Sequence, residues 1–435
     1  MVDWVVPTAS APIRGTFLVP PSKSIHQRAL ALAVLSEGVS RIETDGDPGE
    51  DVVGLARALS ALVGRDVPPR GSVEGAFGSE GLGSGRESLA LEFGRNATGF
   101  RIAAALTCLR PSGARTLLRG DRRLLARPHG PLLRAIGSLG GHAIRKPSGS
   151  VRVIAGGIAG GEVSLAATRS SQFATALAIA ATRWGGISIR LVGDAASIGY
   201  LDLTIESLRA FGVDASREGN AIRVPGAPPR AANVVVEADA SSAAAWWTAA
   251  ALTGGAAIVP TLHADSRQPD TALLGVLSRM GASVERRPDG TVQVRGPASG
   301  LSGAGDVDLR GSPDLAPLVA ALAAGAAGET RVVGAPHLRL KESDRIASVV
   351  SAVRAIGGDA EECEDGFVVR GVGAGRLTGG IVDAAGDHRL VLAFGALGLA
   401  VPGVSVRGAE AVGKSYPAFR EAAGRAARGQ PVGRD

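Results

Sequence analysis

Charged and hydroxyl side chains gather at a few places along this chain, and lysine marks three of them. Of the 47 basic residues, only Lys23, Lys146, Lys341 and Lys414 are lysines. Lys23 stands in PPSKSIHQRA, Lys341 in RLKESDR and Lys414 in GKSYP. Ammonium and guanidinium groups suit the binding of phosphate and carboxylate groups, because both donate several hydrogen bonds to oxyanions. These segments therefore predict a site for small anionic ligands.

Most of these segments open a predicted helix. The helix-starting residues Ser and Asp also precede Ala- and Leu-rich runs in SSQFATAL, DASSAA, SPDLA and GDHR, and Asn precedes one in NATGFR. A helix N-terminus presents free N–H groups and the positive end of the helix dipole, so it binds anions. Any single start could be a plain helix cap. Several starts with Lys and Arg beside them favour the binding of a polyanionic pair of ligands.

The helix starts belong to a sixfold repeat. Each copy joins a small polar start, an Ala/Leu helical run, a glycine and a β-rich segment. The glycines that end the runs recur every 69 to 75 residues, at Gly38, Gly113, Gly186, Gly255, Gly328 and Gly403. A second amphipathic helix follows in each copy. The pattern predicts strand–helix–strand–helix–strand units whose first helix is buried beneath the strands. A simple α/β solenoid is the alternative, which the length of the copies disfavours.

Length and composition set further bounds. The 435 residues suggest two domains of about 200 residues each. Cys108 and Cys363 form no metal-type pair, so we expect neither a zinc site nor a disulfide framework. The N-terminus lacks the pattern of a signal peptide, and no apolar run reaches the roughly 18 residues of a membrane span. The Gly/Ser-rich stretch Gly71–Arg86 predicts a loop.

Nine motifs in order identify the family that the chain resembles. They are PPSKSIHQRA, ATGFR, GDRRLLARP, SSQFATAL, DASSAA, SPDLA, RLKESDR, GDHR and GKSYP. In these motifs, from about Pro20 to Tyr416, the chain resembles the 5-enolpyruvylshikimate-3-phosphate synthase family. The resemblance implies an α/β fold, a two-domain inside-out α/β barrel with three βαβαββ-type repeats and buried helices in each domain.

The resemblance also implies domain boundaries. One domain would comprise residues 21–235 and hold the acceptor phosphate. The other would comprise residues 1–20 and 236–435, so that the N-terminal strand belongs to it. Pro20 and Val236 would lie at the hinge, and the active site would lie in the interdomain cleft.

The reaction that the resemblance implies moves the enolpyruvyl group of phosphoenolpyruvate to the 5-hydroxyl of shikimate 3-phosphate, with release of phosphate, in aromatic amino acid biosynthesis. The phosphoenolpyruvate site would be formed by Lys23, Ala97, Arg127, Gln172, Arg345, Arg389 and Lys414. The shikimate 3-phosphate site would be formed by Ser24, Arg28, Ser170, Ser171, Gln172, Ser197, Tyr200, Asp314 and Lys341. Further candidates of open role are Arg95, Arg101, His337 and His388.

The chemistry requires two proton transfers, since the acceptor hydroxyl loses a proton while C3 of phosphoenolpyruvate gains one. Asp314 is the candidate base for the hydroxyl. Glu342, with Lys23, is the candidate for the C3 proton. A purely structural ion pair of Glu342 with its basic neighbours is the alternative. Because fixed cations stabilise the developing charge, we expect neither a metal nor a cofactor.

Three residues depart from the pattern of the family. Arg95 replaces an expected Asn, Ala97 an expected Gly, and His337 an expected Asn. Gly lets a ligand approach the backbone because it has no Cβ, and Ala97 adds one methyl group there. In this family the inhibitor glyphosate competes with phosphoenolpyruvate beside this loop. We therefore expect the chain to be insensitive to glyphosate.

Alternative functions stay open at this point. The nearest is an enolpyruvyl transferase that acts on a UDP-sugar, a nucleotide or another acceptor of specialised metabolism. The net charge of +6 and the pI near 9.9 also allow a nucleic-acid-binding or RNA-end-processing protein, but aromatic residues are scarce and 41 acidic residues intersperse the basic ones. A ligand-binding pseudoenzyme is disfavoured because both acid–base carboxylates are present. We expect a cytoplasmic monomer whose partners are small anionic substrates, with no nucleic acid and no membrane.

Overall fold

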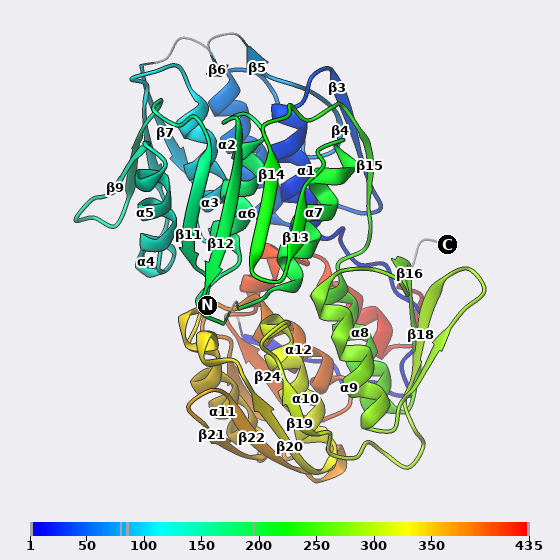
Figure 1. Cartoon of the computed structure of the whole chain (residues 1–435). Helices are drawn as coiled ribbons and strands as arrows, with labels where there is room; N and C mark the ends of the chain where they lie inside the picture. The colour runs from blue at the N-terminus through cyan, green and yellow to red at the C-terminus, as the bar shows by residue number, and fades with distance from the viewer. Residues whose placement is uncertain (1–2, 79–80, 84–86, 195, 433–435) are drawn as a thin grey trace. The chain divides into compact units, whose positions relative to one another are not determined.

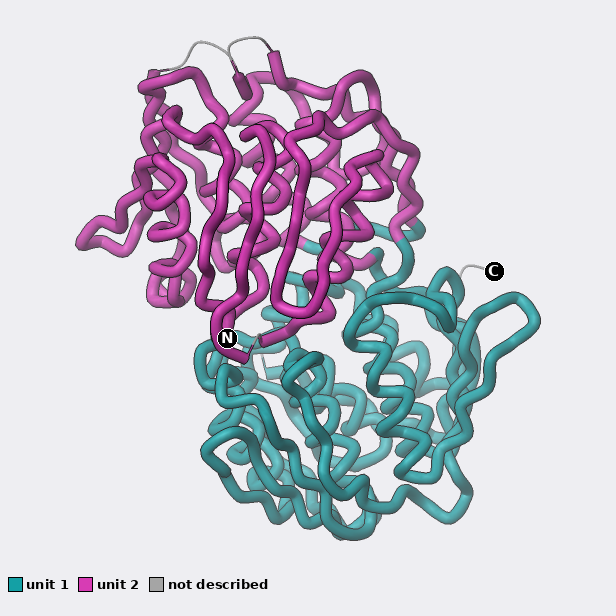
Figure 2. The backbone as a smooth tube through the Cα atoms, in the orientation of Figure 1, with its two compact units in different colours: residues 1–21, 45–49, 237–435 teal, residues 22–44, 50–236 magenta. Residues whose placement is uncertain are grey.

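Two compact units divide the chain in this computed structural model, which describes residues 3–78, 81–83, 87–194 and 196–432. Unit 1 comprises residues 1–21, 45–49 and 237–435, and unit 2 comprises residues 22–44 and 50–236 (Figure 2). Each unit has its own hydrophobic core, one built on Trp246 and Leu318 and the other on Leu32 and Ile179. The chain therefore passes from one unit to the other several times.

Unit 2 contains seven α-helices among its described residues: α1 (Lys23–Leu35), α2 (Glu50–Val63), α3 (Ala97–Leu106), α4 (Arg122–Ala126), α5 (Gly130–Ser138), α6 (Gln172–Ala181) and α7 (Gly199–Ala210). Its strands are β3 (Val39–Thr44), β4 (Gly71–Glu74), β5 (Phe77–Gly78), β6 (Gly81–Leu82), β7 (Ser88–Glu92), β8 (Arg115–Arg119), β9 (His142–Arg145), β10 (Val151–Ile154), β11 (Gly161–Ala166), β12 (Gly186–Val192), β13 (Ser216–Glu218), β14 (Ala221–Pro225) and β15 (Asn233–Val236). A short 3-10 turn, η1 (Thr107–Leu109), follows α3.

Unit 1 contains six α-helices in its described part: α8 (Ala240–Thr253), α9 (Leu273–Arg279), α10 (Ala316–Gly325), α11 (Arg345–Ala355), α12 (His388–Gly398) and α13 (Phe419–Ala427). Its strands are β1 (Asp3–Val5), β2 (Arg14–Thr16), β16 (Ala256–His263), β17 (Ser283–Arg286), β18 (Thr291–Arg295), β19 (Gly305–Asp308), β20 (Ala327–Val333), β21 (Asp359–Glu362), β22 (Phe367–Val372), β23 (Gly380–Asp383) and β24 (Val404–Arg407). Its 3-10 segments are η2 (Pro269–Ala272), η3 (Pro313–Leu315), η4 (Pro336–Leu340), η5 (Ala374–Arg376) and η6 (Ala409–Lys414).

Each unit holds three sheets of three or four strands in its described part. Those of unit 2 have the strand orders β15-β3-β4, β7-β8-β10-β9 and β11-β12-β14-β13. Those of unit 1 have the orders β1-β24-β23, β17-β18-β16-β2 and β19-β20-β22-β21. In every one of these sheets one pair is parallel, such as β7 with β8, and the remaining pairs are antiparallel, such as β8 with β10. In four of the sheets the two parallel strands flank one helix in the sequence, as β7 and β8 flank α3, because a parallel connection needs a crossover. The predicted mixed α/β architecture is confirmed.

Strands from outside the local repeat complete three of the sheets. β15 pairs in parallel with β3, at the other end of unit 2. The N-terminal strands β1 and β2 pair with β24 and β16 of unit 1. In Figure 1 the blue N-terminal segments lie among the green-to-red elements of unit 1. The N-terminal segment thus belongs to the same unit as the C-terminal half.

The first helix of each repeat is buried. All residues of α10 and α12 are buried, as are the residues of α8 up to Ala251. Alanine and glycine make this possible, because small side chains let neighbouring helices and the sheets approach closely. Among the described residues, no helix is both long and apolar enough to cross a membrane.

The prediction of a loop across Gly71–Arg86 is wrong in part. β4 pairs antiparallel with β3, and the short strands β5 and β6 pair with each other. Glycine-rich composition disfavours a strand, but here the backbone of β4 finds its hydrogen-bond partners on Val39–Ile42. The rest of the stretch, residues 79–80 and 84–86, lies outside the described residues.

Candidate active site

Unit 2 places the predicted residue Lys23 at the first position of α1, beside the start of α2. Lys23 Nζ lies 3.2 Å from Asp51 Oδ2, and both side chains are largely buried. Asp51 is in the first turn of α2, where a carboxylate also meets the positive end of the helix. The ammonium group is thus held by a carboxylate from a second helix.

Asn96 connects this pair to the third helix start. Its side-chain oxygen accepts a hydrogen bond from Gly99 N and so caps α3. Its Nδ2 donates to Gln27 Oε1 at 2.9 Å and to the backbone oxygen of Asp51 at 2.7 Å. Because one amide satisfies three partners in a buried place, it fixes the starts of α1, α2 and α3 relative to one another. Ala97, which follows, is buried at the first position of α3.

Arg101 is a fully buried guanidinium of α3. Its Nη1 donates to Ser170 Oγ at 3.1 Å and to Gln172 Oε1 at 2.5 Å, and its Nη2 donates to the backbone oxygen of Pro128 at 3.1 Å. Burial, and next the charge of Arg127, lower the pKa of Arg101 well below its usual value. Arg101 therefore orients the start of α6 and the loop that carries Arg127.

The loop after α4 carries Arg127 and is fixed from its other side by His129. The His129 ring lies 4.6 Å from the Phe100 ring, centroid to centroid, and its Nε2 bonds the backbone oxygen of Leu124 at 2.9 Å. Burial first, and then Arg101, lower the pKa of His129 to about 3. A neutral ring is the form that suits a place between two guanidinium groups. Arg95, by contrast, is half exposed and pairs with Asp121 at 2.7 Å.

Arg28 uses its guanidinium within unit 2. It donates to Thr204 Oγ1, Thr175 Oγ1 and the backbone oxygens of Ser24 and Tyr200, at 2.6 to 3.3 Å. Burial lowers its pKa to about 10. Arg28 thus connects α1, α6 and α7, the helices whose first turns carry predicted acceptor-binding residues.

Ser197 has an unusual backbone. Its φ of 59° lies in the left-handed region, where a residue with a Cβ is strained. The residue is buried, and its hydroxyl has no hydrogen-bond partner among the described residues. Ser197 lies just before the N-terminus of α7, and Tyr200 lies in the first turn of that helix. Strain together with an unused buried hydroxyl indicates a ligand-binding role.

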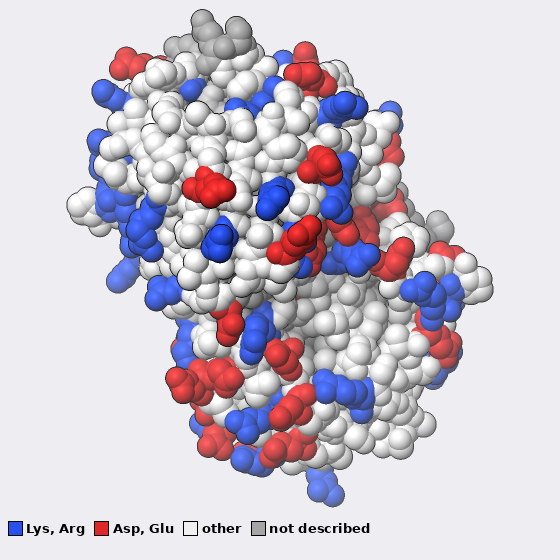
Figure 3. Space-filling model, in the orientation of Figure 1, with Lys and Arg blue, Asp and Glu red and all other residues white. Residues whose placement is uncertain are grey.

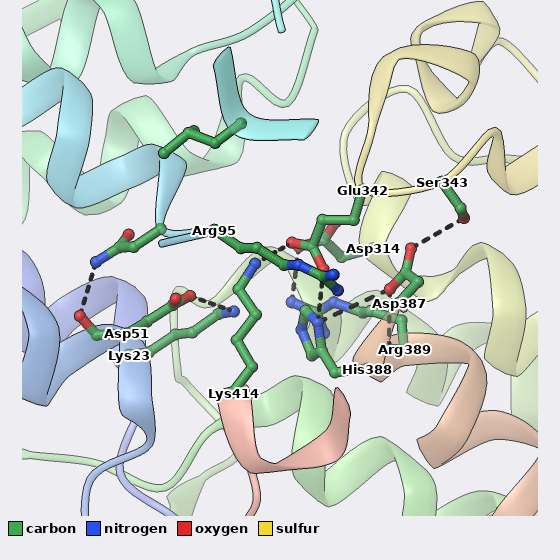
Figure 4. Close-up of polar contacts among 12 residues, drawn as sticks. Lys23, Asp51, Arg95, Asp314, Glu342, Ser343, Asp387, His388, Arg389 and Lys414 are labelled. Carbon is green, nitrogen blue, oxygen red and sulfur yellow. Dashed lines mark hydrogen bonds and ion pairs between the residues drawn. The ribbon is translucent and has the colours of Figure 1, made fainter. Parts of the chain in front are cut away.

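Unit 1 brings Asp314, Arg345 and Arg389 together from three helix starts. Asp314 lies in η3, Arg345 begins α11, and Arg389 is the second residue of α12. Arg345 Nη1 lies 2.6 Å from Asp314 Oδ1, and Arg389 Nη2 lies 2.7 Å from Asp314 Oδ2. One carboxylate therefore bridges two buried guanidinium groups. Figure 4 shows Asp314 and Arg389 of this group.

These arginines decide the ionisation of Asp314. Burial by itself would raise the pKa of the carboxyl, but Arg389, Arg345 and Lys341 together hold that pKa well below its usual value. Asp387, the N-cap of α12, has the same relation to Arg345: Arg345 Nε lies 2.7 Å from Asp387 Oδ2, and the pKa of Asp387 is lowered although burial opposes this. The neighbouring guanidinium groups therefore favour the charged form of both carboxylates.

Glu342 lies between a lysine and a histidine. Lys414 Nζ lies 2.5 Å from Glu342 Oε1, and His388 Nδ1 lies 2.8 Å from Glu342 Oε2 (Figure 4). His388, whose role the sequence left open, thus orients the carboxylate of Glu342. A purely structural ion pair with its basic neighbours stays the alternative role of Glu342.

The donor atoms of Glu342, Asp387 and His388 lie within 4.8 Å of one another, and among the described residues this is the group that could hold a metal ion. Two cations already bind the carboxylates, Lys414 on Glu342 and Arg345 on Asp387. A divalent cation there would have to displace them or add to their charge. The geometry favours an anion site over a metal site.

His337 and Lys341 lie in and just after η4. The His337 ring is buried, and its Nε2 has no hydrogen-bond partner among the described residues. Burial, and then Lys341, lower its pKa to about 3. His337 is therefore a neutral ring with one unused nitrogen next to the predicted acceptor residues.

Sequence reasoning missed three polar residues that hold the predicted ones. Asp51 pairs with Lys23, Asn96 caps α3, and Asp270 lies 3.5 Å from Arg389 Nη1. Asn96 could have been found as a helix-starting residue before ATGFR. No local pattern marks Asp51 or Asp270, because their partners are distant in the sequence.

Comparison with known proteins gives one consistent family. The family model described as EPSP synthase (3-phosphoshikimate 1-carboxyvinyltransferase) matches residues 7–422. A 3-phosphoshikimate 1-carboxyvinyltransferase of Halobacterium salinarum is 38% identical over 424 residues, covering 94% of this chain and 95% of that protein. The relative from Methanothermobacter thermautotrophicus is 36% identical and covers 95% and 96% of the two chains.

Solved structures agree with these relatives. An EPSP synthase from Acinetobacter baumannii has a TM-score of 0.78 and 26% identity, with 98% of both chains covered. The enolpyruvyl transferase NikO from Streptomyces tendae has a TM-score of 0.73 at 16% identity and 96% coverage of both chains, which shows a likeness of fold alone.

Proposed function

The chain belongs to the EPSP synthase family, and from this premise we propose how its residues divide the work of transferring the enolpyruvyl group of phosphoenolpyruvate to shikimate 3-phosphate. That transfer is the activity of a 3-phosphoshikimate 1-carboxyvinyltransferase, in aromatic amino acid biosynthesis. Most residues that bind the acceptor lie in unit 2, with Lys341 and Asp314 added from unit 1, and the carboxylates that transfer protons lie in unit 1. Both sets serve one reaction. The observation that carries the proposal is that carboxylates and cations of unit 1 lie paired, two of the pairs at the starts of α11 and α12.

The acceptor phosphate is bound at the start of α6. Ser171 occupies the N-cap position of α6, but its side chain makes no capping hydrogen bond. The hydroxyl of Ser170 is held by Arg101 at 3.1 Å and faces the same helix start. Free backbone N–H groups, two hydroxyls and the positive end of a helix dipole make a phosphate site. Ser24, Arg28, Gln172, Ser197, Tyr200 and Lys341 are assigned to the remainder of the acceptor.

Phosphoenolpyruvate is bound by exchange of partners. Arg345, Arg389 and Lys414 pair with Asp314, Asp270 and Glu342 in this structure. The carboxylate and phosphate of the substrate compete for these cations and take part of their hydrogen bonds. Lys23, Arg127, Gln172 and Ala97 are assigned to the same substrate from unit 2.

Asp314 takes the proton of the acceptor hydroxyl. A carboxylate held at low pKa by two arginines is a weak base. When the anionic substrate neutralises Arg345 and Arg389, it also removes the charges that depress the pKa of Asp314. The base is thereby strengthened only when phosphoenolpyruvate is bound.

Glu342 handles the proton of C3. As the acceptor oxygen bonds to C2 of phosphoenolpyruvate, C3 gains a proton, and the product is a tetrahedral intermediate. The intermediate then loses a C3 proton and phosphate, which restores the double bond. Lys414 and His388, both hydrogen-bonded to Glu342, supply and remove the proton that Glu342 passes on. Lys23 assists from the phosphate side, and the fixed cations stabilise the developing charge.

The test distinguishes residues that bind the acceptor from residues that bind phosphoenolpyruvate, because a variant of each kind should change KM for its own substrate. Ser170→Ala should raise KM for shikimate 3-phosphate about tenfold and leave KM for phosphoenolpyruvate unchanged, since one hydrogen bond to a charged group is worth about 1.5–3 kcal/mol. Lys414→Met should do the reverse and also lower kcat. Val192→Ala, an exposed position of β12, is the control. Equal changes of both constants in Ser170→Ala would contradict the assignment.

The remaining parts of the proposal concern partners. We propose a cytoplasmic monomer with neither metal nor cofactor and with no nucleic-acid partner. Acidic and basic side chains are interspersed on the face drawn in Figure 3, and a nucleic-acid groove needs a continuous basic stripe. The open role of Arg95, Arg101 and His337 becomes one of positioning, and that of His388 becomes the relay of the Glu342 proton.

A further inference from the structure

Asp270 is a buried carboxylate to which the proposed function assigns neither a proton transfer nor a substrate contact. It lies in η2, between β16 and α9, and is only 2% exposed. Ser241 Oγ, in the first turn of α8, donates a short hydrogen bond to Asp270 Oδ2. Arg389 Nη1 lies 3.5 Å from the same oxygen. A buried acid with a cation and a hydroxyl at one oxygen is held in a single geometry.

Hydrogen bonds hold the segment around Asp270 on two sides. Gln268 Oε1 accepts from Ala240 N, and Gln268 Nε2 donates to Ala238 O, which ties the segment to the start of α8. Ser312 Oγ donates at 2.6 Å to the backbone oxygen of Pro269, which ties it to the segment that carries Asp314. Asp270 and Asp314 therefore stand at fixed places on either side of Arg389.

Arg389 is shared by these two carboxylates. Its Nη2 pairs with Asp314 at 2.7 Å and its Nη1 with Asp270 at 3.5 Å. An anionic substrate that binds Arg389 adds a third negative charge to the same guanidinium group. The charged groups that act on Asp270 are Arg389 from α12, Asp314 from η3 and Asp239 from the N-cap of α8.

We propose that Asp270 is a positioning residue whose negative charge on Arg389 opposes phosphoenolpyruvate and whose protonation releases that opposition, so that affinity for phosphoenolpyruvate rises as pH falls. The inference rests on the proposed function of Arg389 in binding this substrate. The acid–base change is that of Asp270, on which the charge of Asp314 acts, and no covalent bond changes. Asp270 acts on the substrate through Arg389, whose Nη1 lies 3.5 Å from Asp270 Oδ2.

The ionisation of Asp270 falls in a useful range. Burial raises its pKa to about 6, with Arg389 opposing this and Asp314 and Asp239 adding to it. Below that pH the residue is neutral, and above it the residue carries a charge. At an effective dielectric constant of about 20, a charged Asp270 and an anion bound to the same guanidinium group repel strongly enough to change affinity about tenfold or more.

The experiment compares Asp270→Asn with the wild type in full chains. We measure kcat/KM for phosphoenolpyruvate at saturating shikimate 3-phosphate between pH 5.5 and 8.5, a range that runs from about half a unit below to about two and a half units above the pKa of Asp270. The amide mimics the protonated acid, so the ratio of variant to wild type should be near 1 at the acid end. It should rise about tenfold toward the alkaline end, and the change should lie in KM with kcat constant. The titration of the substrate itself cancels in the ratio.

Ser241→Ala is the second variant. It keeps the charge of Asp270 but removes the hydroxyl hydrogen bond that lowers the pKa of Asp270, so the pH at which KM begins to rise should move upward. A ratio for Asp270→Asn that stays flat with pH, or that falls below 1 at the alkaline end, overturns the coupling. If Asp270→Asn fails to fold, an unshifted profile of Ser241→Ala overturns it instead.

A third variant separates the coupling from the proposed function. Arg389→Lys keeps the charge but loses the forked geometry, and its KM for phosphoenolpyruvate should rise at every pH. An unchanged KM would overturn the assignment of Arg389 to this substrate. A raised KM in Arg389→Lys with a flat ratio in Asp270→Asn would overturn the coupling alone.

Discussion

Asp314→Asn tests the mechanism most deeply, because Asp314 contributes differently to turnover, as the general base, and to stability, as an ion-pair partner. As general base it contributes about 10²–10⁴ to turnover, which is about 2.7–5.5 kcal/mol of activation free energy. As an ion-pair partner it holds Arg345 and Arg389 at 2.6 and 2.7 Å. The amide keeps the shape of the side chain and loses both the basicity and the charge.

The loss of the ion pairs costs less than the burial of two arginines suggests. Removing one partner of a buried pair costs about 3–5 kcal/mol when the other charge is left alone. Here Arg345 keeps Asp387 at 2.7 Å, and Arg389 keeps Asp270 at 3.5 Å. We therefore expect the free energy of unfolding to fall by about 1–3 kcal/mol, so that the variant stays folded at 25 °C.

The assay follows phosphate release with both substrates saturating, and calorimetry measures binding of shikimate 3-phosphate to the same preparation. We expect kcat to fall by about two to four orders of magnitude while the acceptor still binds. The matched control is Asp359→Asn, which removes an exposed carboxylate 3.6 Å from Arg370 and should leave kcat unchanged. A kcat for Asp314→Asn within about threefold of the wild type would remove Asp314 from the role of base.

Three further predictions concern other parts of the structure. His26 is buried, and burial lowers its pKa to about 4, so the stability from its neutral ring is present in full above pH 6.5 and is lost as pH falls toward 4. Between neutral pH and pH 4.5, denaturant unfolding should show His26→Gln losing about 2–3 kcal/mol less of its free energy of unfolding than the wild type. Equal losses would contradict the buried neutral ring. Asp51→Asn should lower kcat/KM for phosphoenolpyruvate about tenfold, because a charged pair of this kind contributes about 1.4 kcal/mol or more and Lys23 loses its carboxylate partner; steady-state kinetics with an unchanged value would show that Lys23 needs no such partner. Ala97→Gly should gain sensitivity to glyphosate, since the buried methyl group at the start of α3 is removed; inhibition of the wild type at low concentration, or an unaltered variant, would show that the methyl group does not exclude the inhibitor.

Much of the fold follows from the sequence because the repeat is strong and its physics is local. Ala-rich runs between a polar start and a glycine predict buried helices, and α10 and α12 are buried along their whole length. Strand pairing is less local. The Gly/Ser composition of Gly71–Glu74 disfavours a strand, yet β4 exists because β3 supplies its backbone partners.

The candidate site was predictable in its residue types and unpredictable in its partners. Lysines and arginines at helix starts indicate anion binding from sequence alone. The carboxylates that hold them come from distant segments, as with Asp51 and Asp270, so only the fold pairs them. The strained φ of Ser197 is likewise a tertiary property, because no local pattern forces a serine into the left-handed region.

The most direct measurement of the central claim is phosphate release from phosphoenolpyruvate with a panel of acceptors under one set of conditions. The panel contains shikimate 3-phosphate, UDP-N-acetylglucosamine and a nucleoside monophosphate, each with the wild type and with Ser197→Ala. The account predicts release with shikimate 3-phosphate, weakened in Ser197→Ala through KM for that acceptor. Release with one of the other acceptors and none with shikimate 3-phosphate would contradict it.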